Sequence, residues 1–489
     1  MGISARQEAM TPSSALIDIG GSSVKVTIFA GHSHRIYSHE VPIKTKIDAR
    51  HVFIEPNHLF PLVIEAMNKC SVNLPIGLEI DKVYVSSLRQ GFCLIMNENE
   101  ITPIYLNSDT SGEEAKQYLE DYGSIRLYEE TGHWFAPQLT LPKVISLMRR
   151  NSELIEVSTR LLFVHDWLVW KMTGVILTEM TLVSAGQFAD IKNGNINIEL
   201  LEHFEIPSSI IPAPSKVGTE ISEFNSELLS NLNSHWQSAK LFVGGGDSHF
   251  LHMGATGNSE KKIVVSAGSS TPISLLSPTY GGATVFKPWI STSFMENIYF
   301  IEGNLGYPGS YYGWLKRNLS MPLSAKTLNI DFLSKAPMVF GSCNMWNEQK
   351  WDWRPAFSFL GNISECTGEE LALGVALDYA FALESQISAF ISDGFDIDQV
   401  IITGGGANED IQKILNSLID CPVEIMPSEI AIRNLFLTMS DEKGEGFEWG
   451  IPSEKLDQET SEFLKCQSVK HALMYEQVEG TRKVLENVR

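Results

Sequence analysis

The chain lacks the features that would assign it to several common classes of protein. Its six cysteines are far apart and form no C-x-x-C pair, so neither a zinc site nor a disulfide framework is indicated. Its richest apolar stretch, residues 161–183, is broken by a histidine, a lysine and two acidic residues, and is not expected to span a membrane. The first residues contain no apolar signal core. These absences favour a protein of the reducing cytoplasm.

Positive charge is scarce as well. The sequence has 37 Lys and Arg against 59 Asp and Glu, which gives a formal net charge of -22. Nucleic acid and anionic membranes would be repelled at long range, so we expect neither as a partner. A small neutral substrate fits this charge best, because one that carries phosphate would need a local basic pocket. Among assemblies, a homodimer is left open.

Two common nucleotide-binding motifs are also missing. The sequence has no G-x-x-x-x-G-K-[ST] motif, and no G-x-G-x-x-G within a βαβ unit that has a suitably placed acid. The 489 residues, 43% of them hydrophobic, instead favour an ordinary α/β protein of two or three domains. We predict helices at residues 51–76, 141–148, 161–172 and 369–391, and strands at residues 80–86, 241–243, 263–266 and 399–403.

A glycine-rich hairpin is predicted near the start of the chain. Residues 15–19 and 24–29 alternate as two strands would, with glycines and serines between them. That turn can offer backbone N–H groups and hydroxyls to a phosphate, while Asp18, near the end of the first strand, could hold a magnesium ion through water. An ordinary hairpin with a solvated aspartate is the alternative.

A run of three glycines lies near the middle of the chain. Residues 241–243 predict the end of a strand, and Gly244 to Gly246 then let the backbone turn sharply. Asp247 would be delivered on a tight connection, where its carboxylate could act as a general base. In one alternative Asp247 only caps the next helix. In another, Asp247, His249 and His252 bind a metal.

The second half of the chain repeats the strand-and-turn pattern. The strand at 263–266 leads into a Gly-Ser-Ser-Thr turn at residues 268–271, a second candidate phosphate cradle. The strand at 399–403 leads into three more glycines and the start of a helix, a geometry that places a helix N-terminus beside a nucleotide. Such units recur in duplicated folds whose two like domains face each other across a cleft.

Four polar or aromatic residues are candidates for contact with a substrate. Arg89 and Gln90 would follow the strand at 80–86, at the end where ligand-binding groups of open α/β sheets collect. Asp109 follows a second short strand and Trp134 lies in an aromatic loop, so both could reach a polar ligand with apolar faces. Taken singly, each of these residues has an equally plain structural explanation. A further aromatic cluster at 345–361 is more typical of a core or an interface.

Taken together, the motifs resemble those of the FGGY family of carbohydrate kinases. The motifs stand in the family's order: Asp18 with Gly20, Gly21, Ser22 and Ser23; Gly245-Gly246-Asp247; Gly268, Ser269 and Ser270; and Gly404, Gly405, Gly406 and Ala407. The resemblance covers about residues 14–439. It implies an α/β fold of two actin-like (ribonuclease H-like) domains that face each other across a nucleotide and sugar cleft. The expected divisions are a sugar-binding domain at 13–250, a nucleotide-binding domain at 251–440 and a charged helical extension at 441–489.

The resemblance also implies roles for these residues. Asp247 would take the proton of a sugar hydroxyl as that hydroxyl attacks the γ-phosphate of ATP, and Asp18 together with Asp247 would orient Mg²⁺. The turns at 20–23 and 268–270 would bind phosphate, and the motif at 404–407 would bind adenosine. Arg89, Gln90, Asp109 and Trp134 would contact the sugar, and the segment at 347–349 would match the family's Gly-Glu-Arg loop.

The sequence departs from the family pattern at three places. The Trp and Arg of the family's W-x-D-x-R segment are absent around Asp109, Ser146 stands where Trp is usual, and residues 429–434 replace a Gly-Ala helix start. The rhamnulokinase branch varies there too, so we expect a ketose, deoxyhexulose or polyol substrate. A non-catalytic sugar- or nucleotide-binding regulator, and an ATPase driven by a protein partner, are the alternatives.

Overall fold

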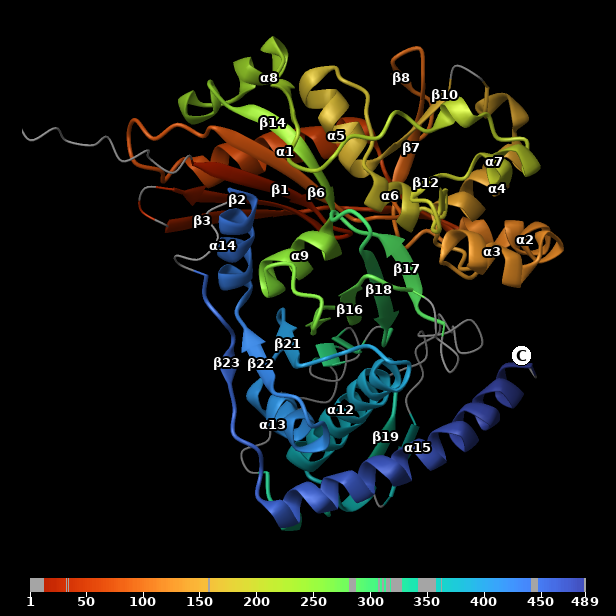
Figure 1. Cartoon of the computed structure of the whole chain (residues 1–489), viewed down its shortest axis with the longest axis vertical. Coiled ribbons are helices and arrows are strands. Elements are labelled where there is room, and N and C mark those ends of the chain that lie inside the picture. Colours follow the sequence, from red (N-terminus) through yellow and green to blue (C-terminus); the bar gives the residue numbers. More distant parts are fainter. Residues whose placement is uncertain are drawn as a thin grey trace, which may run out of the picture. The chain divides into compact units, whose positions relative to one another are not determined.

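The computed structural model divides the chain into two compact units (Figure 1). Unit 1 consists of Met1–Gly254, Ile290–Ile298 and Ile432–Phe447, and unit 2 of Ala255–Trp289, Tyr299–Ala431 and Glu448–Arg489. The chain thus passes to unit 2 a few residues after the predicted boundary at 250, and it returns to unit 1 twice. The structure describes residues 13–31, 33, 35–156, 159–280, 287–306, 308–309, 312–313, 317, 328–341, 358–361, 363–440 and 447–487.

Unit 1 is built on a six-stranded sheet with the order β13-β14-β6-β1-β2-β3 (Figure 1). Strands β1 and β2 form the predicted antiparallel hairpin, while β6 runs parallel to both β1 and β14. The carboxyl ends of β1, β6 and β14 therefore lie at one edge of the sheet. The strands are β1 (Ser14–Ile19), β2 (Ser23–Ala30), β3 (Arg35–Pro42), β6 (Lys82–Ser87), β13 (Glu220–Glu223) and β14 (Lys240–Gly246).

A second sheet and most helices complete unit 1. The sheet has the order β10-β7-β9-β5-β4, with β8 paired to β7. Its strands are β4 (Lys46–Asp48), β5 (His51–Ile54), β7 (Phe92–Met96), β8 (Asn99–Glu100), β9 (Ile104–Tyr105) and β10 (Thr159–Phe163); β11 (Ala189–Asp190) and β12 (Asn195–Ile196) form a separate pair. The helices are α1 (Pro56–Ser71), α2 (Lys116–Tyr122), α3 (Ser124–Thr131), α4 (Thr140–Arg150), α5 (Val164–Thr173), α6 (Met180–Ala185), α7 (Ile198–His203), α8 (Ser226–Asn231) and α9 (Asp247–Thr256).

Unit 2 repeats the topology of unit 1. Within unit 2 its sheet has the order β18-β16-β15-β21-β22-β23, in which β15, β21 and β22 are parallel and β16, β18 and β23 run against their neighbours. The same order and senses relate β3, β2, β1, β6, β14 and β13. This duplication agrees with the two similar strand-and-turn motifs of the sequence.

The remaining strands and helices lie after residue 261. The strands are β15 (Lys262–Ser266), β16 (Pro272–Ser277), β17 (Trp289–Thr292), β18 (Tyr299–Asn304), β19 (Met338–Phe340), β20 (Ser358–Leu360), β21 (Gln399–Thr403), β22 (Val423–Met426) and β23 (Ile451–Pro452). The helices are α11 (Ile330–Leu333), α12 (Gly368–Ser392), α13 (Glu409–Leu418), α14 (Ser428–Met439) and α15 (Gln458–Asn487). In the described part of the chain, no helix is both long and apolar enough to cross a membrane.

Two helices begin later than the sequence predicts. The segment at 51–76 opens with strand β5, and α1 starts only at Pro56. The segment at 161–172 opens with the end of β10, which pairs antiparallel with β7, and α5 starts at Val164. Both errors have one cause: a short apolar run that is buried as a strand has no periodicity to distinguish it from a buried helix.

The prediction for the glycine run is also wrong. Gly244 to Gly246 are the last residues of strand β14, and Asp247 begins helix α9 instead of lying on a turn. The glycines are needed for close packing: a Cβ atom on Gly244 would lie 1.7 Å from the carbonyl oxygen of Val85 on the neighbouring strand. Position 244 therefore admits no side chain.

We expect Gly244→Ala to destabilise unit 1 severely, because the methyl group would overlap backbone that cannot move away without opening β6. Overpacking of this kind costs about 1–3 kcal/mol or more. Urea unfolding measures the change. Gly405→Ala is the control, since a Cβ at that position meets no atom within 4 Å, and equal stability of the two variants would contradict the packing argument.

Candidate active site

Four predicted residues come together at the carboxyl edge of the unit 1 sheet. Asp18 on β1 is level with Ser86 on β6, and Ser86 is in turn level with Gly245 on β14. Arg89 and Gln90 directly follow β6, and Asp247 directly follows β14. The Arg89 Nε atom lies 3.7 Å from Asp247 Oδ1.

Asp247 is both held in place and accessible. The backbone N–H of Ser248 donates to Asp247 Oδ1 at 2.7 Å, and the Ser248 hydroxyl lies 3.3 Å from the same oxygen. The side chain nevertheless keeps 39% of its surface exposed. The surrounding protein raises the pKa of Asp247, and the positive charge of Arg89 opposes this shift. A fixed, reachable carboxylate with a raised pKa is suited to accept a proton.

The surroundings of Asp18 disfavour its ionised form. Burial and the nearby charge of Asp247 raise its pKa to about 7, against a hydrogen bond from Ser86 that lowers it. Its Oδ1 atom is buried and has no hydrogen-bond partner among the described residues. Two carboxylates that repel each other electrostatically, one of them with an unused buried oxygen, supply the oxygen ligands that Mg²⁺ prefers. The residues present therefore fit a magnesium ion.

The alternative metal site gains no support. Among the residues that the structure describes, no three or more His, Cys, Asp or Glu side chains are placed to hold a metal ion. His249 and His252 are buried, and His249 Nε2 lies 3.1 Å from the carbonyl oxygen of Thr292. Burial lowers the pKa of both histidines.

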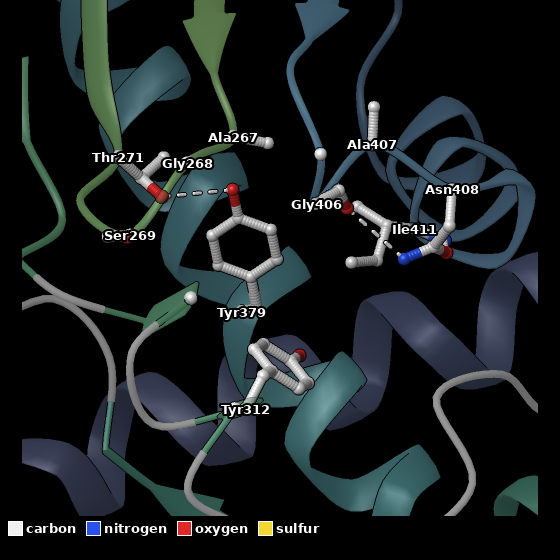
Figure 2. Close-up of a pocket in the computed structure, with 13 residues that line it drawn as sticks. Ala267, Gly268, Ser269, Thr271, Tyr312, Tyr379, Gly406, Ala407, Asn408 and Ile411 are labelled. Carbon is white, nitrogen blue, oxygen red and sulfur yellow. Dashed lines mark hydrogen bonds between the residues drawn. The ribbon is translucent and has the colours of Figure 1, made fainter. Parts of the chain in front are cut away.

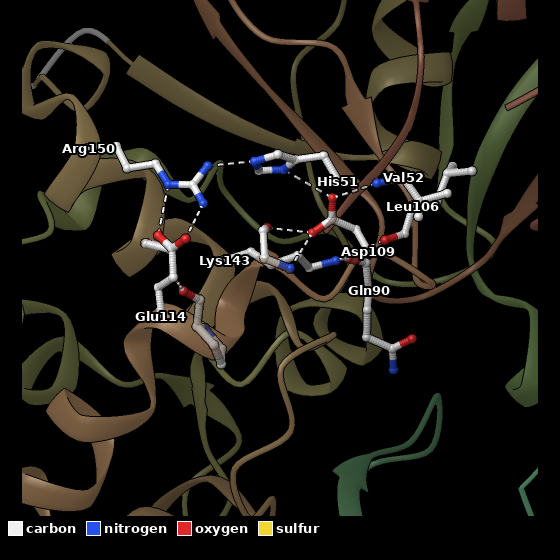
Figure 3. A network of polar contacts seen from close by, with 11 residues as sticks. His51, Val52, Gln90, Leu106, Asp109, Glu114, Lys143 and Arg150 are labelled. Carbon is white, nitrogen blue, oxygen red and sulfur yellow. Dashed lines mark hydrogen bonds and ion pairs between the residues drawn. The ribbon is translucent and has the colours of Figure 1, made fainter. Parts of the chain in front are cut away.

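Arg89 and Gln90 are positioned differently. The Arg89 side chain packs along Gly246, where a Cβ atom would lie 2.9 Å from Arg89 Cγ. The Gln90 carbonyl accepts hydrogen bonds from Lys143 Nζ at 2.9 Å and from the Thr140 hydroxyl at 3.2 Å. Figure 3 shows the Gln90 amide pointing away from this network, although the residue as a whole is buried.

Asp109 lies inside that network (Figure 3) and is already fully used. One oxygen accepts the backbone N–H of Val52 at 2.9 Å, and the other accepts the N–H and the hydroxyl of Ser111 at 3.0 and 2.5 Å. His51 Nδ1 lies 3.3 Å from Oδ2, and the carboxylate has no exposed surface. The Asp109 carboxylate is thus held by protein groups, and its contact with a sugar stays a prediction.

Lys143 links this network to the sheet edge. Its Nζ donates to the carbonyl of Leu106 at 3.0 Å as well as to that of Gln90. Burial lowers the pKa of Lys143 to about 7, against the opposing charge of Asp109. The amine therefore holds the backbone at Gln90 even where it is uncharged.

This pKa leads to a prediction for stability. Between pH 7 and 10 the unfolded chain binds a proton at Lys143 that the folded chain does not, so stability rises with pH. Relative to Lys143→Met, the unfolding free energy of the wild type should rise by up to about 1.4 kcal/mol per pH unit from pH 7 to 9. Urea unfolding at several pH values measures it. The exposed Lys240→Met variant should run parallel to the wild type, and a parallel Lys143→Met curve would contradict the assignment.

Trp134 and the turn of Gly20 to Ser23 are the other parts of unit 1 for which the sequence predicts contact with a ligand. Trp134 lies between α3 and α4 with 2% of its surface exposed, so its indole is mostly enclosed. The turn of Gly20 to Ser23 is closed by a hydrogen bond from Gly20 N to the Ser23 carbonyl at 3.0 Å. It directly follows the strand that carries Asp18.

Unit 2 holds a pocket of 470 Å³ at the ends of β15 and β21 (Figure 2). Five of the predicted nucleotide-binding residues line it: Gly268, Ser269, Gly405, Gly406 and Ala407. Ser270 and Gly404, which are also predicted, are not among the lining residues. The two turns are joined by a hydrogen bond from Gly406 N to the Ala267 carbonyl at 2.8 Å. Gly404 has φ of 100°, and a Cβ there would lie 2.7 Å from that carbonyl oxygen. Glycine is therefore required at this turn.

Sequence reasoning missed the two tyrosines of this pocket. Figure 2 shows the Tyr379 ring between the turn at Gly268 and the turn at Gly406, with its hydroxyl 3.2 Å from Thr271 Oγ1. Tyr312 lies beside it and donates to the carbonyl of Val375 at 2.8 Å. Asn408 accepts the N–H of Ile411 and so caps helix α13. The pocket combines an apolar wall with bare backbone and a helix N-terminus, as nucleotide sites do.

Some predictions cannot be placed. The segment at 347–349, expected to match the Gly-Glu-Arg loop, and most of the aromatic cluster at 345–361 lie outside the described residues. Other buried polar residues were missed altogether. His165, Asp166 and Glu179 served in the sequence only as interruptions of an apolar stretch, although a charged residue within such a run is itself the signal of a buried polar contact.

Comparison with known proteins places this geometry in a family. Residues 14–249 match the N-terminal domain of the FGGY family of carbohydrate kinases. YoaC of Bacillus subtilis, whose name refers to the sugar kinases, is 26% identical over 313 residues, which are 62% of this chain and 61% of YoaC. The xylulose kinase of Staphylococcus xylosus is 22% identical over 80% of this chain and 82% of its own.

A solved structure extends the likeness to almost the whole chain. The xylulose kinase of Rhodospirillum rubrum superposes with a TM-score of 0.78 over 96% of this chain and 99% of its own, at 14% identity. At that identity the likeness concerns the fold, and it agrees with the duplicated sheets of units 1 and 2. The predicted fold class is confirmed. Residues 14–249 belong to the FGGY family of carbohydrate kinases, and the chain as a whole has that family's α/β fold of two actin-like domains.

Proposed function

We propose that the protein transfers the γ-phosphate of ATP to a hydroxyl of a small sugar: a ketose, a deoxyhexulose or a polyol. The observation that carries this proposal is the pair Asp18 and Asp247 at one sheet edge, with a raised pKa on both and an unused buried oxygen on Asp18. The names of the relatives, among them a xylulose kinase, support the substrate class.

Asp247 acts as the general base in this proposal. Its carboxylate accepts the proton of the attacking hydroxyl, while the Ser248 N–H and Arg89 hold it in one orientation. Arg89 and the amide of Gln90 bind the other hydroxyls of the sugar. Phosphoryl transfer asks mainly for such positioning and for stabilisation of charge, because little covalent chemistry falls to the protein.

The nucleotide and metal sites follow from the same pattern. The pocket of unit 2 binds the nucleotide, with the backbone at Gly268 and Gly406 facing its phosphates and Tyr379 in its wall. Asp18 and Asp247 hold Mg²⁺, which when bound neutralises the charge of the transferred phosphoryl group. Unit 1 accordingly binds the sugar and unit 2 the nucleotide. A net charge of -22 favours a free, neutral sugar as the substrate, and we place the enzyme in the cytoplasm.

A screen of ATP consumption tests the proposal. Ketoses, deoxyhexuloses and polyols are offered one at a time with ATP and Mg²⁺, and ADP formation is coupled to NADH oxidation. We expect one group of related sugars to stimulate ADP formation and the others to leave it at the background. Stimulation by none of them, with a properly folded protein, would contradict the proposed reaction.

A further inference from the structure

One backbone N–H next to the base has no partner in the sheet. Strand β14 pairs with β6 up to Phe242 and again from Gly245, and two residues of β14 stand opposite Val85 in between. Val243 bonds to the other side, through Thr219 and Gly218. Gly244 is buried, and an unpaired buried N–H would cost about 1–3 kcal/mol. Its donor therefore needs a partner from outside the sheet.

His165 supplies that partner. The N–H of Gly244 donates to His165 Nε2 at 3.1 Å, so Nε2 carries the lone pair and the hydrogen lies on Nδ1. Nδ1 donates to Asp166 Oδ1 at 2.8 Å, and neither side chain has exposed surface. The backbone N–H of His165 donates to the hydroxyl of Ser87 at 3.1 Å. The imidazole is thus fixed at both of its ring nitrogens in one tautomer, and the backbone of His165 is anchored to β6.

Asp166 is fixed in turn by its own place in helix α5. Its Oδ2 accepts the backbone N–H of Phe163 at 3.2 Å, which makes it part of the cap of that helix. The line of contacts from Phe163 through Asp166 and His165 to Gly244 therefore joins α5 to β14. A carboxylate behind an imidazole sets which ring nitrogen can accept.

We call the contacts from Asp166 through His165 to Gly244 the clamp. It matters because glycine has more backbone freedom than any other residue. Three glycines in a row lead to Asp247, and none has a side chain that could anchor it. At the far end of the run, Gly246 N lies 3.4 Å from the Thr181 hydroxyl, a long contact. His165 makes the shorter one, at the start of the run. The contact with His165 therefore anchors the run at its start, and the pairing of Gly245 and Gly246 with β6 carries that anchor on to Asp247.

We propose that His165, backed by Asp166, is a positioning residue for the base Asp247 and acts by accepting the Gly244 N–H. This inference rests on the proposed kinase function for its kinetic consequence. Both ring nitrogens of His165 are engaged, by Gly244 and Asp166, and the side chain is fully buried, so it takes no part in proton transfer to the sugar. Misplacing a reacting group by 1 Å can lower the rate by about 100-fold.

Two substitutions separate the acceptor from the bulk of the ring. In His165→Gln the amide oxygen reaches the place of Nε2 and can still accept from Gly244, whereas in His165→Asn the shorter side chain reaches only the place of Nδ1. We expect kcat to fall about 10- to 100-fold in the Asn variant, with the KM for ATP unchanged, and to stay close to wild type in the Gln variant. His235→Asn is the control, since the His235 ring also bonds a backbone group of unit 1, in this case the carbonyl of Leu78.

Hydrogen exchange gives a readout that does not depend on activity. The peptide of residues 240–247 should exchange faster in His165→Asn than in the wild type, and at the wild-type rate in His165→Gln. Equal kcat and equal exchange in the Asn variant and the wild type would overturn the inference, as would an equal loss in the Asn and Gln variants. A wild type without sugar-dependent ATP consumption would instead refute the kinase function, while the exchange comparison still decides whether the clamp exists.

Discussion

Asp247→Asn should fold normally, bind sugar and lose nearly all turnover. The asparagine has almost the same shape and keeps an oxygen for the Ser248 N–H, but it cannot accept a proton at neutral pH. Loss of a general base lowers kcat by about 10²–10⁴-fold. The coupled assay of ADP formation measures kcat, and calorimetry measures the affinity for the sugar found in the screen.

The control for this variant is another aspartate at the start of a helix. Asp457 accepts the N–H of Thr460 at the beginning of α15, and it belongs to no proposed site. Asp457→Asn should keep the kcat of the wild type. Turnover by Asp247→Asn within a few-fold of that of Asp457→Asn would show that another group removes the proton.

Asp18→Asn should lose activity and gain stability at the same time. The folded protein binds a proton at Asp18 up to about pH 7, whereas an unfolded aspartate loses it near pH 3.8. The wild type is therefore progressively destabilised as the pH rises from about 4 to 7, by at most about 1.4 kcal/mol per pH unit. The neutral amide does not titrate, and it also removes the repulsion of Asp247.

Unfolding by urea at pH 5 and pH 8 tests the effect on stability. The unfolding free energy of Asp18→Asn should exceed that of the wild type by more at pH 8 than at pH 5, in a buffer without divalent cations. Mg²⁺ should stabilise the wild type more than the variant, because a cation between the two carboxylates offsets their repulsion. Loss of stability in Asp18→Asn at pH 8, or an equal effect of Mg²⁺ on both proteins, would contradict the role given to Asp18.

Much of the fold could be predicted because its signals are local. The hairpin around Asp18, the strand before Gly268 and the strand before Gly404 each end in a glycine turn, and all three strands exist where the spacing placed them. The prediction of a turn at the glycine run before Asp247 is wrong because the signal there is not local. Gly244 serves contact with Val85, which is far away in the sequence, and no local pattern distinguishes that use from a turn.

The same limit applies to the contacts made at the candidate site. Asp109 follows a strand end as a ligand-binding residue would, but its oxygens are used by backbone and by His51, which lies 58 positions earlier. His165 and Asp166 interrupt an apolar run, and only the fold reveals that they meet Gly244. Side chains that bind distant backbone leave no periodic trace, so pairing in three dimensions has to be known first.

Analysis of the phosphorylated product tests the central claim most directly. The wild type is incubated with ATP, Mg²⁺ and the sugar selected by the screen, and products are followed by ³¹P NMR. The account predicts one sugar phosphate for each ADP formed and little inorganic phosphate. With Asp247→Asn it predicts neither ADP nor the sugar phosphate. ADP accompanied by an equal amount of inorganic phosphate, without a sugar phosphate, would identify an ATPase and contradict the proposed function.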